Sequence, residues 1–250
     1  MKKTTRVERK KRRKRIFFRL ILLSTLMSIA VIFAFNSDFF YIDYIFVEGN
    51  KSIVYDQIVN SSMIDKGENI FRIKIKDSED EIKKMPYIKE AHVKRKIPNK
   101  IYITVEEREV AYQFKVLSSY ILLDKDGYVL ELTDEQVENV PIFNGFDISD
   151  IKVGESILTN TANEALTVFF NDDTVLNTIS KMSIITYDEL ENDVNIDLIN
   201  GIGVAFGSLD NVKYKMKLLD KILVDIEKKQ IQCKMIIMNK GENPILVTDN

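Results

Sequence analysis

The chain has 250 residues, of which 45% are hydrophobic and 30% are charged, with nine glycines and four prolines. This composition is typical of a folded protein long enough for one large or two small domains, and it argues against a low-complexity chain. The overall net charge is −2, but residues 1–19 carry eleven Lys or Arg and a single acid, so the remainder carries a net charge of −12. The two parts of the chain therefore differ sharply in electrostatic character.

A long apolar segment, Ile16 to Phe35, follows the unbroken basic run that ends at Arg15. At about 1.5 Å per residue it reaches roughly 30 Å, the thickness of the hydrocarbon core of a bilayer. Arg19 lies within one turn of the basic end, where its stem can reach the headgroups, and aromatic residues 39–41 suit the opposite interface. We predict an uncleaved membrane-spanning helix over residues 16–36. A cleaved signal peptide is the main alternative, but the segment is too long and lacks a small-residue cleavage site.

Residues 1–15 form a predicted cytoplasmic tail, because positive charge is retained on the cytoplasmic side of a span. The chain from about residue 36 onward is then extracytoplasmic. Nucleic-acid binding by the basic run is an alternative, but next to a span the contact with lipid headgroups is the simpler interpretation, and we predict no nucleic-acid partner. Cys233 is the only cysteine, so this exported part contains no intrachain disulfide.

The pattern of residues 39–107 predicts a small α+β unit. A strand, two short helices and two further strands follow one another, which places the helices on one face of a short sheet. We expect Ser52 to cap the first helix, and Asp77 or Ser78 to cap the second. The predicted strands cover residues 41–47, 91–95 and 100–106, with a turn at Pro98 and Asn99 joining the last two.

Alternation in the two later strands assigns their faces. One set of side chains is predicted to lie in the core, namely Val93, Ile101, Ile103 and Val105, and the other at the surface, namely Lys94, Lys96, Lys100 and Glu106. His92, the only histidine, falls on the surface phase. We therefore interpret it as a solvated side chain rather than a catalytic base.

Strand patterns dominate residues 108–248. A hairpin turns at residues 124–127, and an amphipathic helix over residues 211–229 presents one apolar stripe. Another helix is expected to begin at Asn160 or Thr161. Further strands are predicted at residues 140–145, 182–185, 194–198, 203–206, 232–238 and 244–247.

No pattern of catalytic, cofactor or metal residues is evident. The single His and the single Cys lie 141 positions apart, whereas nucleophilic catalysis and zinc binding both need such residues in groups. The Asp-Lys-Asp-Gly of residues 124–127 lacks the remaining ligands of a calcium loop, and Gly201 to Gly207 does not have the spacing of a nucleotide-binding loop. A wall-modifying enzyme built on paired carboxylates stays an alternative, although the chain has no Trp for a sugar-binding cleft.

Several motifs in order resemble the FtsQ/DivIB family of cell-division proteins. They include Pro86-Tyr87-Ile88, the strand pattern that ends at Glu107-Arg108, and the late glycine-containing strand before a Lys-rich helix. The others are Val47 to Asn50, Glu68 to Ile73, the hairpin at 123–129 and Pro141 to Gly145. Each motif is weak alone, but their order and spacing are specific, and the resemblance covers nearly the whole chain.

The resemblance implies an α+β fold class with four parts. These are the basic tail 1–15, a single transmembrane helix 16–36, a POTRA domain (β-α-α-β-β) at 39–107, and a mostly antiparallel β domain with flanking helices at 108–248. Glu107 and Arg108 form the domain junction. The family implies no enzyme activity and no cofactor, and it implies a place at the division septum.

The partners implied are small coiled-coil division proteins of the FtsL and FtsB/DivIC type, and through them the FtsW–FtsI type synthase of septal peptidoglycan. In the family, the last strands of the β domain recruit a partner by strand addition. The matching candidates here are Lys234, Met235, Ile236, Ile237 and Met238.

The chain departs from the family pattern at three places. Tyr87 replaces the usual Trp, Val110 stands where a proline usually enters the β domain, and the polar run of the late strand is absent from Ile236 to Asn239. A membrane-anchored extracytoplasmic sensor or regulator is the main alternative function, although the tail of residues 1–15 is too short for a cytoplasmic domain.

Overall fold

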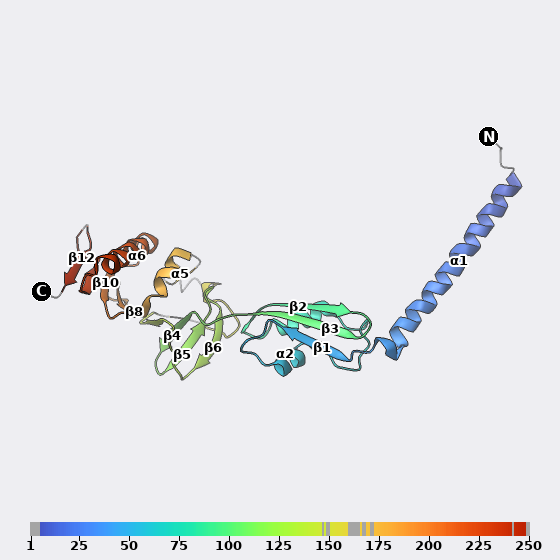
Figure 1. Cartoon of the computed structure of the whole chain (residues 1–250), viewed down its shortest axis with the longest axis horizontal. Coiled ribbons are helices and arrows are strands. Elements are labelled where there is room, and N and C mark those ends of the chain that lie inside the picture. The colour runs from blue at the N-terminus through green and yellow to red at the C-terminus, as the bar shows by residue number, and fades with distance from the viewer. Residues whose placement is uncertain are drawn as a thin grey trace. The chain divides into compact units, whose positions relative to one another are not determined.

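The structure is a computed structural model that describes residues 6–146, 148, 151–159, 166, 169–170, 173–241 and 243–248. The chain divides into two compact units (Figure 1). The first unit consists of Met1–Lys83 and Ile88–Glu107, and the second consists of Lys84–Tyr87 and Arg108–Asn250. The short segment 84–87 therefore belongs by its contacts with the second unit, although it lies in sequence within the first.

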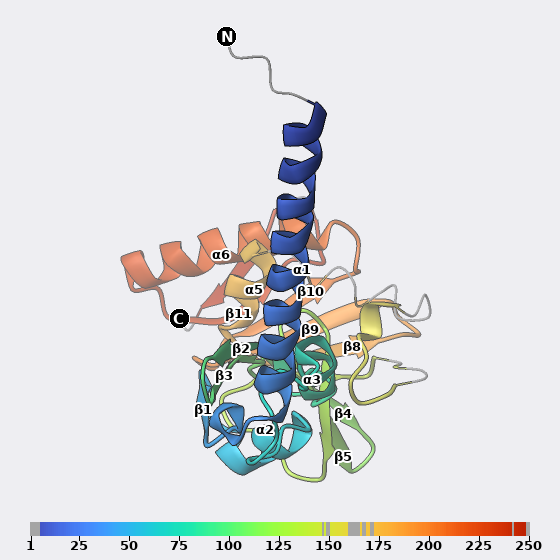
Figure 2. The ribbon, with the colours of Figure 1, turned by 90° about the vertical axis from the view of Figure 1, so that its right-hand side faces the viewer.

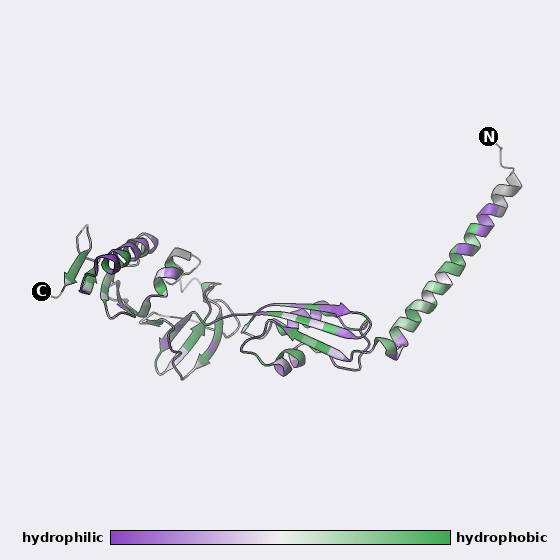
Figure 3. Ribbon diagram, viewed as in Figure 1, coloured by the Kyte–Doolittle hydropathy of each residue, from purple (hydrophilic) through white to green (hydrophobic). Residues whose placement is uncertain are grey.

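Helix α1 (Arg6–Asn36) contains the predicted apolar segment. Its part from Arg12 to Asn36 has a mean hydropathy of 2.4 with no residue buried, so it is long and apolar enough to cross a membrane. The hydropathy colouring shows hydrophilic residues near the start of α1 and hydrophobic ones along most of its remainder (Figure 3). The helix predicted over residues 16–36 is thus confirmed as a helix.

The first unit has the predicted order of elements, with β1 (Tyr44–Glu48), α2 (Tyr55–Ser61), α3 (Ile75–Ile82), β2 (Ile88–Lys96) and β3 (Lys100–Glu107). The sheet order is β1-β3-β2, so the last strand lies in the centre. β3 pairs antiparallel with β2 and parallel with β1. This arrangement follows because a tight turn joins β2 to β3, whereas two helices and β2 lie between β1 and β3 in the chain.

The predicted faces of β2 and β3 are confirmed. Val93, Ile101, Ile103 and Val105 are buried in the core of this unit. They share that core with hydrophobic side chains of the two helices, such as Ile58 of α2 and Ile82 of α3. His92 is exposed on the other face. Since the helices cover only one face, the alternate side chains of the sheet face solvent.

Both predicted helix caps in this unit are wrong. α2 begins at Tyr55 after Val54, and α3 begins at Ile75 after Lys74, neither of which caps with its side chain. The backbone N–H of Ser52 instead donates to the carboxylate of Glu107, 55 positions later. Ser78 lies inside α3 and is buried. A local capping pattern was therefore overridden by a long-range hydrogen bond and by core packing.

The second unit is built on one nine-stranded sheet in the order β12-β11-β10-β9-β8-β7-β4-β5-β6. Five of its neighbouring pairs are antiparallel and three are parallel, which confirms the predicted mostly antiparallel fold. The strands are β4 (Tyr112–Val116), β5 (Ser119–Leu123), β6 (Val129–Thr133), β7 (Ile142–Asn144), β8 (Met182–Asp188), β9 (Asp193–Leu198), β10 (Gly203–Gly207), β11 (Cys233–Ile237) and β12 (Ile245–Thr248).

Helices α5 (Asp173–Ile179) and α6 (Val212–Lys229) lie along one face of this sheet (Figure 2). Their apolar stripes join one buried cluster with the inward side chains of the strands, among them Val204, Phe206 and Ile236. The opposite face of β9 to β12 carries no described helix. The helix predicted to begin at Asn160 or Thr161 lies mostly outside the described residues.

A glycine at a positive φ angle follows a parallel-paired strand in each unit. Gly49 follows β1 and Gly145 follows β7, at φ angles of 89° and 79°. A Cβ atom built on Gly49 would lie 2.1 Å from the carbonyl oxygen of Val105, and one built on Gly145 would lie 2.1 Å from that of Tyr187. Only glycine allows the chain to turn this close to the neighbouring strand.

We expect Gly49→Ala to lower the free energy of unfolding of the first unit by at least about 2 kcal/mol, because it adds a backbone collision to the strain of a positive φ angle. Gly67→Ala is the matched control, since Gly67 has a φ angle of 86° but no atom within 4 Å of the position that a Cβ would occupy. It should cost only about 1 kcal/mol. Urea unfolding in detergent, followed by the fluorescence of a Trp introduced as Phe46→Trp, measures both. Equal losses would show that the close approach is not what makes glycine necessary.

Candidate functional site

The predicted docking residues Lys234 to Met238 lie in or directly after β11, which is an interior strand. β11 pairs in parallel with β10 on one side, where Val204 lies opposite Ile236. It pairs antiparallel with β12 on the other side, where Leu246 lies opposite the same residue. Both hydrogen-bonding edges of β11 are therefore occupied. The free edge at this end of the sheet belongs to β12.

The five predicted residues also do not form one surface. Ile236 is fully buried in the core, whereas Met235 is 38% exposed on the opposite face. Lys234 is exposed at a register shift between Cys233 and Met235, and the N–H of Met238 donates to the carbonyl oxygen of Ala205 at 2.8 Å. The structure thus separates these side chains between the core, the open face and the end of the strand.

Two residues of β12 extend the exposed apolar surface to the sheet edge. Val247 lies opposite Met235 in the strand register, and Ile245 lies opposite Ile237. Ile245 is 52% exposed and Val247 is 39% exposed. We call Met235, Ile237, Ile245 and Val247 the edge patch. The residue pattern predicts the strand at 244–247 but carries no signal for its position at the edge of the sheet.

Glu107 anchors the end of β3 within the first unit. Its carboxylate accepts backbone N–H groups from Lys51 at 2.8 Å, Ser52 at 2.9 Å and Ile53 at 3.0 Å. Partial burial alone would raise the pKa of Glu107, but these three donors and the charge of Lys51 outweigh it and lower the pKa below its usual value. The carboxylate therefore holds in place the loop that leads into α2.

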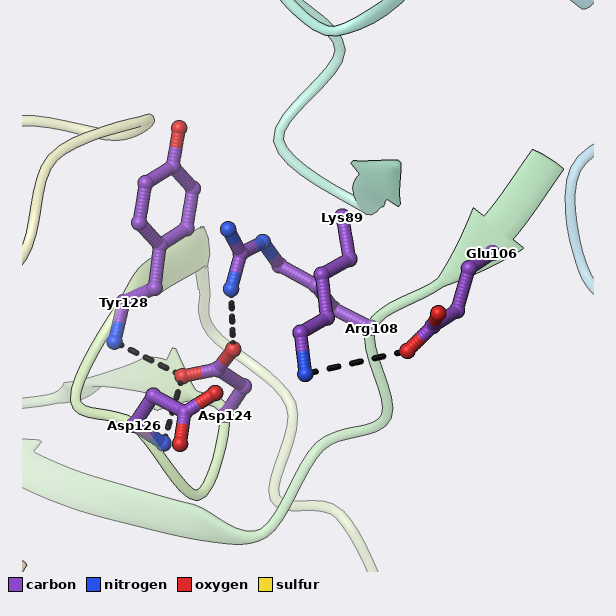
Figure 4. A network of polar contacts seen from close by, with 6 residues as sticks. All are labelled: Lys89, Glu106, Arg108, Asp124, Asp126 and Tyr128. Atoms are coloured by element: carbon purple, nitrogen blue, oxygen red, sulfur yellow. Dashed lines mark hydrogen bonds and ion pairs between the residues drawn. The ribbon is translucent and has the colours of Figure 1, made fainter. Parts of the chain in front are cut away.

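Arg108, the next residue, is anchored within the second unit. Its guanidinium forms an ion pair of 2.5 Å with the nearly buried carboxylate of Asp124 and stacks over the ring of Tyr128 at 3.9 Å (Figure 4). The other carboxylate oxygen of Asp124 accepts the N–H groups of Asp126 and Tyr128. The Asp-Lys-Asp-Gly turn thus uses its first aspartate to bind Arg108 and to shape the hairpin, which are structural tasks.

Tyr87 also contacts the second unit, to which its segment belongs. Its hydroxyl donates a hydrogen bond of 2.7 Å to the carboxylate of Glu131 on β6. Burial, together with this bonded carboxylate, raises the pKa of the Tyr87 phenol. The backbone N–H of Arg108 donates to the carbonyl oxygen of Tyr87 at 2.8 Å. Arg108, predicted from the sequence to lie at the domain junction, is thus hydrogen-bonded to Tyr87.

No metal-ligand cluster occurs in the part of the chain that the structure describes, where no three His, Cys, Asp or Glu side chains gather. His92 and Cys233 lie in different units. The features that stand out are therefore surfaces and anchors. A sheet edge with an apolar patch can bind another chain through main-chain hydrogen bonds.

Comparisons with known proteins identify the family of this chain. The model of the FtsQ-type POTRA domain matches residues 40–108. Cell division protein DivIB of Clostridium botulinum (strain Hall) is 33% identical over 241 residues, which cover 94% of this chain and 93% of that protein. The chain belongs to the FtsQ/DivIB family. Cell division protein DivIB of Clostridium tetani is 29% identical over 222 residues, covering 87% of this chain and 77% of the relative.

A solved structure of a DivIB protein is also similar. The major extracytoplasmic domain of DivIB from Geobacillus stearothermophilus matches 49% of this chain and 97% of its own length, at 16% identity and a TM-score of 0.33. This likeness is too distant to supply structural detail. Membership of the family rests on the sequence relatives.

We expect Glu107→Gln to lower the free energy of unfolding of the first unit by about 1–2 kcal/mol at pH 7, because an amide replaces a charged acceptor and faces an N–H group with its own NH₂. The folded-state pKa is below the usual 4.5, so the contribution of this carboxylate is complete above about pH 4.5 and is lost as the pH falls through the lowered pKa. The difference between the wild type and the variant should therefore shrink below pH 4.5.

Urea unfolding at pH 7 and at pH 3, again with the Phe46→Trp reporter, measures this difference. Glu106→Gln is the matched control, because Glu106 is a neighbouring carboxylate in an exposed ion pair of 3.7 Å with Lys89. Such pairs contribute little, about 0–1 kcal/mol. A Glu107→Gln effect that stayed constant down to pH 3 would contradict the assigned role of the charge.

Proposed function

We propose that this chain is a non-enzymatic, membrane-anchored scaffold of the bacterial divisome. Helix α1 serves as the single membrane span over residues 16–36, with the basic tail 1–15 in the cytoplasm and both later domains, 39–107 and 108–248, outside it. This topology is supported by the apolar length of α1 and by the eleven Lys or Arg within residues 1–19. Family membership supports the role in cell division.

The partners in this proposal are small coiled-coil division proteins of the FtsL and FtsB/DivIC type. By binding them, the chain supports and restrains septal peptidoglycan synthesis by an FtsW–FtsI type synthase. The observation that carries the docking proposal is the free edge of β12 beside the exposed edge patch. An added strand would satisfy the unpaired main-chain groups of β12, and the patch would receive its apolar side chains.

The proposed docking site therefore moves from β11 to β12. Lys234 to Met238 contribute to it only through Met235 and Ile237, whose side chains lie beside the edge on the open face. A proline in β11 would disrupt pairing with both β10 and β12, so it would damage the sheet as well as any docking. Substitutions that test docking belong on the exposed face of β12.

Localisation tests the proposed role as a whole. A fluorescent fusion to the full chain, imaged in dividing cells, should concentrate at the division septum, and depletion of the chain should block or delay septation. An even distribution around the membrane together with normal division would contradict a divisome role. Release of muropeptides when the purified chain is incubated with peptidoglycan would instead support the wall-modifying alternative.

We expect Val247→Glu to weaken capture of the FtsB/DivIC-type partner at least tenfold, which corresponds to about 1.4 kcal/mol, because a desolvated charge would lie within the docked interface. Asn195→Glu is the matched control. Asn195 is exposed on β9 and lies opposite Ala205, in the same row as Ile237 but separated from β12 by two strands.

Co-purification of full-length chain and partner from detergent extracts, with titration of the partner, measures the loss. The thermal unfolding of both variants should match that of the wild type, since Val247 is exposed. Equal capture by Val247→Glu and wild type would exclude the edge patch as the docking site, whereas equal losses in both variants would indicate a general effect of charge.

A further inference from the structure

The open face of the first unit's sheet is divided by chemistry along its length. In strand register, Phe46, Tyr102 and Lys94 form one row across β1, β3 and β2, and Tyr44, Lys100 and Lys96 form the next. At the other end of the same face, Glu90 lies opposite Glu106. We call the two rows of aromatic and lysine residues the aromatic–lysine face; they are Tyr44, Phe46, Lys94, Lys96, Lys100 and Tyr102.

The aromatic rings of this face form a continuous exposed surface. Phe46 stacks on Tyr102 with ring centroids 4.8 Å apart, and on Tyr44 at 6.3 Å. Tyr44 is 53% exposed and Phe46 is 38% exposed. The helices α2 and α3 cover only the other face, so no other element in the described part of the unit covers these rings. Three large rings left at the surface of a small unit indicate an interaction surface.

The lysines of this face lack acidic partners. Lys96 lies over the ring of Tyr102 at 5.3 Å, and Lys100 lies over the ring of Tyr44 at 5.6 Å. Neither these two nor Lys94 forms an ion pair with any residue that the structure describes. Among the acids of this sheet face, Glu48 lies opposite Thr104 in the row next to Phe46, and Glu90 and Glu106 lie at the far end. The chemistry of the aromatic–lysine face is therefore complementary to an anionic surface.

This face lies at the end of the sheet that is connected to helix α1. The side chain of Asn69 donates to the carbonyl oxygen of Ala34, in the last turns of α1, at 2.9 Å. Asn99, beside Lys100, accepts the backbone N–H of Asp43 at 3.0 Å and donates through its side chain to the Asp43 carboxylate at 2.7 Å. One hydrogen bond thus holds Asn69 to the last turns of α1, and two others hold the β2–β3 turn to Asp43, seven positions after α1 ends.

Two exposed apolar side chains adjoin these residues. Phe39, three positions after α1 ends, is 63% exposed, and Ile97, in the turn between Lys96 and Lys100, is 61% exposed. Aromatic side chains favour the interface between membrane and water, and lysines near a bilayer are attracted to anionic headgroups within about one Debye length. Such a combination beside a span favours a lipid surface over a soluble acidic peptide.

We propose that the aromatic–lysine face docks on anionic phospholipid headgroups of the leaflet from which α1 emerges. This inference rests on the proposed function, because it requires α1 to span the membrane. Docking would hold the first unit against the bilayer, with the rings at the interface and the three ammonium groups on phosphates. It is independent of the edge patch in the second unit, which a different experiment tests.

The test uses the full chain reconstituted in vesicles, with Phe46→Trp as a reporter, because the natural sequence contains no Trp. The vesicles consist of phosphatidylcholine alone or with about one-third phosphatidylglycerol, and nitroxide-labelled headgroups serve as the quencher. We expect quenching of this Trp to rise in the anionic vesicles and to fall when the salt concentration is raised from about 0.05 to about 1 M. A Trp introduced as Glu90→Trp at the acidic end of the same face should be quenched much less.

Combining Phe46→Trp with Lys94→Gln, Lys96→Gln and Lys100→Gln should lower the ratio of docked to undocked unit by about a hundredfold, since each lysine near the surface contributes roughly fivefold. The matched control carries Lys217→Gln, Lys221→Gln and Lys228→Gln, three exposed positions on α6 with the same total charge change. Its quenching should equal that of the unsubstituted reporter.

Quenching that is equal in both lipid compositions, or that survives the three substitutions on the aromatic–lysine face, would overturn the proposal. Protection of the Phe46→Trp reporter by an added division protein without any lipid dependence would likewise overturn it and assign the face to a protein partner. Flotation of the same vesicles separates this from the proposed function. If the chain fails to float with the vesicles, α1 does not span the membrane, and both the proposed function and the lipid docking are contradicted. If the chain floats but its quenching does not depend on the lipid, only the lipid docking is contradicted.

Discussion

The covalent junction between the two units depends on two adjacent, oppositely charged side chains that are each anchored in a different unit. The carboxylate of Glu107 accepts hydrogen bonds from three backbone N–H groups of the loop before α2. Arg108 pairs with Asp124 and stacks on Tyr128 in the β5–β6 hairpin. Each of these two neighbouring residues is therefore held within its own unit.

The two anchors differ in how much they depend on charge. The Glu107 carboxylate is partly exposed and is stabilised by neutral backbone donors, so a polar replacement retains part of the contact. The Arg108–Asp124 pair is largely removed from water, and the Nε of Arg108 is buried without a partner among the described residues. Such a pair is costly to break, because the remaining charge would stay buried. The hairpin end of the junction is thus the more sensitive one.

Each unit covers one face of its sheet with helices and leaves part of the other face open. The two open faces have different chemistry. In the first unit, the end near α1 carries aromatic rings and lysines that have no acidic partner among the described residues, whereas in the second unit the end near β12 carries an apolar patch beside a free edge. Broad open faces of this kind would suit the scaffold role proposed above.

The sequence by itself determined which segments form helices and strands, and which side of most strands is buried. Apolar length identified α1, and strict alternation identified the faces of β2 and β3, because these are local periodicities that backbone geometry imposes. The local patterns at Ser52 and Ser78 predicted helix caps that do not form. The backbone N–H of Ser52 donates to the distant Glu107, and Ser78 is buried inside α3.

Only the tertiary structure decided the order of strands, and with it the position of the proposed docking surface. β11 pairs with β10, although the whole of α6 lies between these two strands in the chain. β12 then pairs with the other edge of β11. No local pattern in residues 233–248 distinguishes an interior strand from an edge strand, because both alternate in the same way. The same holds for Glu107 and the aromatic–lysine face, whose members come together only when strands from distant parts of the chain pair in register.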